Sequence, residues 1–183
     1  MSTFVALLRG INVSGHRPVN MRRLSAAFAC LGLADVVTYL QSGNVVFDVA
    51  PGDVTELRRR LEAAIDATFG FPVTVLLRTS LQMDRVVKAC PFAAAAAHNP
   101  TRVAVAFLAD EPSPEALGRL TARTHEPDEI LVEGSEAYIH CPDGFGRTKL
   151  SNAYLEKTLG TASTARNWNT VNHLMALAVH RQG

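Results

Sequence analysis

The sequence predicts an α+β protein made of two units that repeat the same order of strands and helices. Short apolar runs of strand type alternate with amphipathic helical stretches, and glycine and asparagine mark the junctions between them. The order strand, helix, strand, strand, helix occurs twice along the 183 residues. Because this is the order of the split β-α-β arrangement, each half is predicted to be a ferredoxin-like subdomain of the β-α-β-β-α-β type.

The first subdomain, residues 1–79, contains the strand segments TFVALL, DVVTYL, NVVFDV and PVTVLLR, and the middle two form a hairpin across QSG. Asn20 can cap its first helix and Gly32 can close it. Asp53 with Glu56 resembles a capping box for the second helix, which ends at Gly70. The predicted buried side of that helix consists of Val54, Leu57, Leu61, Ala64, Ile65 and Thr68.

A helical linker is predicted over residues 80–100, where an alanine run is closed by a proline. The second subdomain, residues 101–183, begins with the strand TRVAVAFLA and a helix that Ser113 caps. Its hairpin consists of DEILVEG and EAYIHC, and a further helix runs from about Ser151 to Gly160. A C-terminal helix is expected in place of an eighth strand. Its apolar side consists of Val171, Leu174, Met175, Ala178 and Val179, with Trp168 on the same side.

The composition indicates a soluble protein of the reducing cytoplasm. Apolar residues make up 48% of the chain, which is enough for a hydrophobic core. Cys30, Cys90 and Cys141 are far apart and form no CxxC pair, so neither disulfides nor a metal site is expected. The opening MSTFVALLRG lacks the layout of a signal peptide, and no apolar run approaches the roughly 18 residues of a membrane-spanning helix. No membrane partner is therefore predicted.

Positive charge is concentrated at the two ends of the sequence. No acidic residue precedes Asp35, and the arginines before it give this stretch a charge of +4. The stretch from Arg147 to Gly183 is also +4, whereas the residues between the two sum to −7 and the whole chain to +1. So small a net charge argues against a protein that coats polyanions, and the distribution favours a local site for an anion.

In a split β-α-β unit, the loop after the first strand and the hairpin between the second and third strands leave the sheet at the same end. We therefore expect RGINVSGHR and QSGN to form one rim, with cationic, amide and backbone donors and no carboxylate. Such a rim suits an anionic or carbonyl-rich ligand, although turns alone also require glycine and asparagine. Its candidate ligand-binding residues are Arg9, Asn12, His16, Arg17, Gln41, Ser42 and Asn44.

The segment DGFGRTKLS connects a strand to a helix and places Arg147 and Lys149 near the helix start. Backbone N–H groups at a helix N-terminus bind anions, and neighbouring cations complete such a site. The spacing of a Walker loop is absent, so a plain loop also accounts for this segment.

The segment TARNWNT contains the only tryptophan and admits two interpretations. Asn167, Asn169 or Thr164 can cap the last helix, and Trp168 either anchors that helix in the core or offers a stacking face to a ligand. Arg166 gains nothing from a helix N-terminus, where the dipole favours negative charge, so its position predicts an anionic or acceptor partner.

Three segments together resemble a bacterial family known as domain of unknown function 1697: LLRGINVSGHRPVNM, YLQSGNVVF and GRTKLSNAYLEKTLGTASTARNWNTVNHL. The resemblance extends from Phe4 to about Leu177. Family members usually read GINVGG where this chain has Ser14, and Gly15 is retained. The resemblance implies an α+β protein with ferredoxin-like subdomains and implies no activity. Its motif residues are Arg9, Gly10, Asn12, Gly15, Gln41, Ser42, Gly43, Asn44, Lys149, Leu150, Arg166, Asn167, Trp168, Asn169 and Thr170.

These observations predict a phosphate-bearing ligand, a nucleotide or a nucleic-acid segment, in a basic cleft between the N-terminal and C-terminal motifs. Arg9, Lys149 and Arg166 are expected on phosphate, with Trp168 or Gln41 and Asn44 near a base. One alternative is an enzyme acting on a small anionic metabolite with His16 as acid or base. The other is that the motifs are purely architectural. No catalytic motif, metal site or cofactor is predicted from the sequence.

Overall fold

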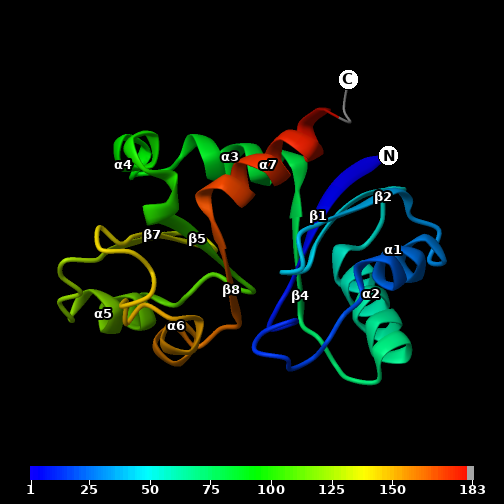
Figure 1. The fold of residues 1–183 in the computed structure, drawn as a ribbon, viewed down its shortest axis with the longest axis horizontal. Helices are drawn as coiled ribbons and strands as arrows, with labels where there is room; N and C mark the ends of the chain where they lie inside the picture. Colours follow the sequence, from blue (N-terminus) through cyan, green and yellow to red (C-terminus); the bar gives the residue numbers. More distant parts are fainter. Residues whose placement is uncertain (181–183) are drawn as a thin grey trace. The chain divides into compact units, whose positions relative to one another are not determined.

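The computed structural model describes residues 1–180 as two compact units (Figure 1). The first unit comprises Met1–Arg85 and the segment from Leu174 onward, and the second comprises Val86–His173. Each unit contains one four-stranded antiparallel sheet. Among the described residues, no helix is both long enough and apolar enough to cross a bilayer.

The first sheet has the strand order β2-β3-β1-β4, which is the order expected of a ferredoxin-like unit and confirms the predicted α+β fold class. Helices α1 and α2 cover one of its faces (Figure 1), where Phe28 and Leu61 pack in one core cluster with Phe4 and Phe47 of the strands. The elements are β1 (Ser2–Leu8), α1 (Met21–Ala29), β2 (Ala34–Tyr39), β3 (Asn44–Val49), α2 (Val54–Phe69) and β4 (Val75–Thr79).

The predicted helix ends in this unit are largely confirmed. The side chain of Asn20 accepts hydrogen bonds from two backbone N–H groups of α1, and the side chain of Asp53 does the same for α2. The reciprocal half of the capping box is replaced by an ion pair, because the Glu56 carboxylate accepts from Arg59 at 2.7 Å. Val54, predicted to be buried, is 47% exposed. The apolar period shows which side of the helix faces the sheet, but it does not show how far along the helix the sheet covers that side.

The second sheet repeats the first with the order β6-β7-β5-β8. Helices α5 and α6 cover one of its faces (Figure 1), and Leu120 and Leu155 pack there with Leu108 and Ile139. Its elements are β5 (Val103–Leu108), α5 (Pro114–Thr121), β6 (Glu129–Glu133), β7 (Glu136–His140), α6 (Asn152–Leu159) and β8 (Ser163–Asn167). Helices α3 (Ser80–Lys88) and α4 (Ala93–His98) and the 3₁₀ turn η1 (Pro100–Arg102) precede β5, and α7 (Trp168–Val179) follows β8.

The expectation that a helix replaces the eighth strand is wrong, because β8 completes the second sheet before α7 begins. Its sequence STARN is polar, so a search for apolar runs does not detect it. The strand is defined instead by its pairing with β5, in which Arg166 lies opposite Val105. In α7, Val171 and Leu174 are buried as predicted, whereas Val179 at the end of the helix is 40% exposed.

Candidate functional site

The loop after β1 and the hairpin between β2 and β3 lie side by side in the first unit. Strands β1 and β2 both run antiparallel to β3, so they end at the same edge of the sheet. The Asn12 side-chain amide joins the two segments by donating to the Gln41 carbonyl at 2.7 Å. The same side chain accepts from Val19 N at 2.8 Å and donates to Val19 O at 3.2 Å. The predicted rim therefore forms, and Asn12 is the residue that holds it together.

The loop has a defined and strained shape. Asn12 N donates to Arg17 O at 3.1 Å and His16 N to Val13 O at 2.9 Å, which folds residues 12–17 into a small hairpin. Asn12, Ser14 and Arg17 have φ values of 54°, 49° and 48°. Left-handed backbone is costly for residues other than glycine, and it persists where the surroundings enforce it, often at binding sites.

The hairpin between β2 and β3 is held by its own side chains. A Cβ atom at Gly43, whose φ is +81°, would lie 2.6 Å from Ile11 Cδ1 and 2.8 Å from Leu8 Cβ, so only glycine fits there. Asn44 is fully buried and its side-chain amide donates to Tyr39 O at 2.8 Å and to Ser42 Oγ at 3.0 Å. We therefore assign Asn44 to the hairpin itself, whereas Gln41 and Ser42 are exposed beside the loop.

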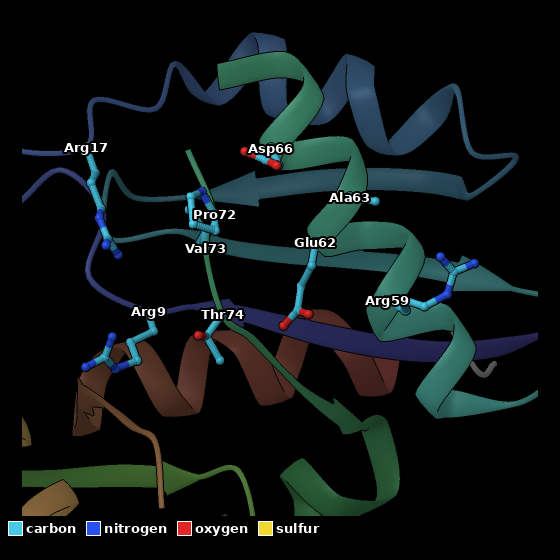
Figure 2. A pocket seen from close by; sticks show the side chains of 9 residues that line it. All are labelled: Arg9, Arg17, Arg59, Glu62, Ala63, Asp66, Pro72, Val73 and Thr74. Carbon is cyan, nitrogen blue, oxygen red and sulfur yellow. The ribbon is translucent and has the colours of Figure 1, made fainter. Parts of the chain in front are cut away.

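A surface depression of about 440 Å³ lies next to this rim. Figure 2 shows Arg9 and Arg17 of the loop after β1 on one side of residues 72–74, and Glu62 and Asp66 of α2 on the other side. The expectation of a rim without carboxylates is thus wrong for the depression itself, because the two acids come from a helix distant in sequence. Its remaining lining residues are Arg59, Ala63, Pro72, Val73 and Thr74.

The charged groups of this depression differ in how far they are already engaged. Glu62 Oε1 accepts from Val75 N at 2.9 Å, which fixes that carboxylate against the start of β4. Among the described residues, the Arg17 guanidinium has no ion pair and no hydrogen-bond acceptor. The His16 imidazole does not line the depression. It is exposed and has no such partner within the described chain, so no neighbour orients it for proton transfer. A site with this mixture of charges can bind a ligand that carries both an anion and hydrogen-bond donors.

The second unit presents its own cationic loop between β7 and α6. The turn is built by Gly144, whose φ is +92° and whose missing Cβ leaves room for the Arg102 guanidinium. Ser151 caps α6 by accepting from Tyr154 N at 3.2 Å. Arg147 and Lys149 are exposed between these points, and neither forms an ion pair or side-chain hydrogen bond with any described residue.

The segment TARNWNT is the junction between β8 and α7. Arg166 is 6% exposed, and its guanidinium donates to Thr164 Oγ1 and to Ala165 O, both at 2.8 Å. Burial lowers the pKa of this guanidinium to about 10. Asn167 is the cap of α7, because its Oδ1 accepts from Thr170 N at 2.9 Å. Trp168, the first residue of α7, is half-buried.

The predicted residues therefore fall into two groups. The first group consists of the rim residues, which the structure brings together in the first unit. The second group belongs to the second unit, where Arg147 and Lys149 lie in one loop and Arg166 to Asn169 lie at the junction of β8 and α7. Asn169 is exposed. The basic cleft between the two groups stays a prediction. No cluster of three or more histidine, cysteine, aspartate or glutamate side chains within the described range is placed to hold a metal ion.

The fold and these loops define an α+β protein of two repeated units with exposed cationic loops. The chain belongs to the family described as "Protein of unknown function (DUF1697)", whose model matches residues 1–138. This match includes the first two of the three resembling segments, and the resemblance beyond residue 138 stays a prediction.

A solved structure shares this fold. The conserved bacterial protein SP0830 from Streptococcus pneumoniae matches with a TM-score of 0.77, covering 97% of this chain and 98% of its own, at 19% sequence identity. At this identity the likeness concerns the fold alone. No curated protein sequence matches the chain.

Proposed function

We propose that this protein binds a phosphate-bearing ligand, a nucleotide or a short nucleic-acid segment. Arg9 and Arg17 of the first unit contact phosphate, and the exposed Gln41 lies beside the base. Arg147 and Lys149 of the second unit supply further cations for the same kind of ligand. Arg166 is buried, so its part is to position β8 and α7 rather than to meet the ligand.

A comparison of one junction in the two units carries the proposal. After β1, Arg9 N donates to Thr74 O at 3.0 Å, and after β5, Ala109 N donates to Ala162 O at 2.9 Å, so the chain leaves both sheets in the same way. Residues 109–113 suffice to reach α5, whereas residues 9–20 separate β1 from α1.

The fold therefore does not need the longer connection. Its exposed part, residues 13–18, contributes nothing to the core, and it adds strained backbone at Ser14 and Arg17. It also places a guanidinium without a partner in the described chain at the edge of a depression. A ligand-binding role accounts for all three features, whereas the alternative that this loop is purely architectural accounts for none of them.

The mixed charge of the depression favours a nucleotide over a simple polyanion. Arginine forks match phosphate oxygens, and the carboxylates of Glu62 and Asp66 can accept from ribose hydroxyls or base amino groups. The carboxylate of Asp66 is exposed and has no hydrogen-bond partner among the described residues. A ligand with acceptors at one end and donors at the other satisfies both sides of this depression.

The test is a calorimetric titration of the full chain with three probes: the four ribonucleoside 5′-monophosphates, a single-stranded DNA oligonucleotide and inorganic phosphate. A nucleotide, the oligonucleotide or both are expected to bind. Arg17→Ala should weaken that affinity by about tenfold or more, because it removes a hydrogen bond between charged groups. Binding of the oligonucleotide should fall steeply with added salt, which separates it from a nucleotide site.

Arg85→Ala is the matched control, because Arg85 is exposed, does not line this depression and carries the same charge as Arg17. It should leave the affinity unchanged. The proposal fails if none of the probes binds, or if the Arg85 and Arg17 variants lose affinity equally.

A further inference from the structure

A second depression, of about 540 Å³, lies between α5 and α6 on the second unit. Every charged side chain that lines it is a cation: Arg119, Arg123 and Lys157. Its other lining residues are Ala122, Tyr154 and Thr158. It is thus unlike the depression beside the rim, where carboxylates offset the arginines.

The first cation is fixed in place. Arg119 Nε and Nη2 both donate to the Thr158 carbonyl, at 3.3 Å and 3.1 Å, which ties α5 to the last turn of α6. These two hydrogen bonds to one carbonyl orient the planar guanidinium and leave its other N–H donors available. A cation near a helix C-terminus also complements the helix dipole, so the position of Arg119 has a structural reason of its own.

The first unit contains the same clamp, meaning an arginine of one helix that donates to a carbonyl near the end of the next. Comparing the two units shows which features of the depression the fold requires and which are specific to the second unit. Arg23 Nη2 of α1 donates to Thr68 O of α2 at 2.8 Å, just as Arg119 donates to Thr158 O. There the arginine is covered by an aromatic ring, with Arg23 Cζ 5.2 Å from the centroid of Phe69. The clamp itself therefore belongs to the shared scaffold.

The second unit adds two cations to this clamp. Lys157 precedes Thr158, where alanine precedes Thr68 in the first unit. Arg123 lies over the Tyr154 ring, with its Cζ 6.0 Å from the ring centroid. Neither Arg123 nor Lys157 forms an ion pair or a side-chain hydrogen bond with a described residue.

Tyr154 supplies the aromatic wall of the depression. Its ring meets His125 edge-on at 5.7 Å between centroids, and the His125 Nε2 lies 3.2 Å from the Leu120 carbonyl, so the ring has a fixed support. The Tyr154 hydroxyl is buried and has no hydrogen-bond partner among the described residues. Because this hydroxyl is closed to solvent, Tyr154 contributes its ring, and not its hydroxyl, to the wall of the depression.

From this arrangement we infer that the depression between α5 and α6 binds the phosphate group of a small phosphate monoester. The lining contains three cations and no acidic side chain, which suits a phosphate dianion better than a singly charged carboxylate ligand. The two guanidinium groups can each donate two hydrogen bonds to the phosphate oxygens. The volume leaves room for the organic group of the ester against the Tyr154 ring. This site is separate from the rim of the first unit and does not depend on the function proposed for that rim.

The test is an NMR titration of the ¹⁵N-labelled full chain with phenyl phosphate. Saturable shifts are expected at the backbone amides of residues 119–123 and 154–158. Arg123→Ala and Lys157→Ala should each raise the dissociation constant at least tenfold while the melting temperature stays nearly unchanged, because both side chains are exposed.

Arg85→Ala and Arg17→Ala are the controls, and both should bind phenyl phosphate at this depression with unchanged affinity. The inference is overturned if residues 119–123 and 154–158 show no saturable shifts, or if the Arg123 and Lys157 variants bind as well as the unmodified chain. Shifts confined to residues 9–19 would overturn it while supporting the proposed function, so the two failures are distinguishable.

Discussion

The two units repeat one scaffold but extend it at different junctions. Where the last strand meets the following helix, the units agree: Arg78 pairs with Val5 in the first sheet and Arg166 with Val105 in the second. Both arginines are at most 6% exposed, and each donates to the carbonyl of the preceding residue. A feature that appears in both units at the same register belongs to the scaffold.

Two other junctions differ. Residues 9–20 connect β1 to α1, whereas residues 109–113 make the equivalent connection in the second unit. Conversely, residues 141–151 connect β7 to α6, whereas residues 50–53 make the equivalent connection in the first. The first extended connection carries the exposed Arg17 and the second the exposed Arg147 and Lys149, and none of these three has an ion pair or side-chain hydrogen bond in the described chain. The short equivalents show that the fold does not require these cations. The difference supports the proposal that Arg17, Arg147 and Lys149 bind the ligand, whereas the buried Arg166 recurs as Arg78 in the first unit and is expected to serve the scaffold.

The largest effect is expected where the extended loop of the first unit packs against its hairpin. Gly43→Ala should lower the free energy of unfolding by about 2–5 kcal/mol, because it adds left-handed strain and a clash with Leu8 Cβ and Ile11. Gly134→Ala in the equivalent hairpin should cost only about 1–2 kcal/mol, since its φ is +57° but no atom lies within 4 Å of the added Cβ. Urea unfolding of both variants measures the difference, and equal losses would contradict the packing argument.

The two buried arginines should respond alike. Arg78→Ala and Arg166→Ala should each cost about 2–4 kcal/mol, because each removes a buried cation and its hydrogen bonds to the sheet. In a chain of this length that is a fall in melting temperature of roughly 4–16 °C. Arg85→Ala, at an exposed position, is the control and should change little. A stable Arg166→Ala variant that no longer binds a nucleotide would show that Arg166 contacts the ligand after all.

Much of this scaffold could be predicted from the sequence because it depends on local chemistry. Caps such as Asn20 and Ser113 and the apolar stripes of α1 and α2 act within one or two helical turns. Strand β8 could not be predicted in the same way. Its polar residues Thr164 and Arg166 are buried by tertiary pairing, and a pattern of apolar runs does not register them.

The candidate site could be predicted in outline because strand order places the loop after β1 beside the hairpin, which groups Arg9, Asn12 and Gln41. Sequence reasoning missed Glu62 and Asp66, which reach the depression from a helix remote in sequence. Their spacing of four residues places both on one side of α2, but nothing local indicates which loop that side faces.

A smaller effect is expected from loosening the extended loop without removing a charge. Asn12→Ala should cost about 1–3 kcal/mol, because three hydrogen bonds to Val19 and Gln41 are lost. The Val19 amide, which donates to the Asn12 side chain, should then exchange its hydrogen faster. Nucleotide affinity should fall because the loop that carries Arg17 is no longer tied to the hairpin at Gln41. Asn20→Ala removes only a helix cap, so it should cost about 1 kcal/mol and leave the affinity unchanged. Unchanged Val19 exchange in the Asn12 variant would contradict the role of this tether.

The smallest effect concerns Asn167, and its sign distinguishes the two interpretations of TARNWNT. Asn167→Ala should lower the free energy of unfolding by about 1 kcal/mol, because the Asn167 side chain accepts a hydrogen bond from the first turn of α7. Thr79 caps α3 in the same way, so Thr79→Ala should have the same effect. Asn167→Asp keeps that acceptor and adds negative charge where the helix dipole favours it, so stability should stay the same or rise by about 0.3–1 kcal/mol. If Asn167 instead contacts a phosphate, the aspartate should weaken nucleotide binding more than the alanine does. Thermal unfolding and calorimetry of the same two variants therefore separate a cap from a ligand contact at one position.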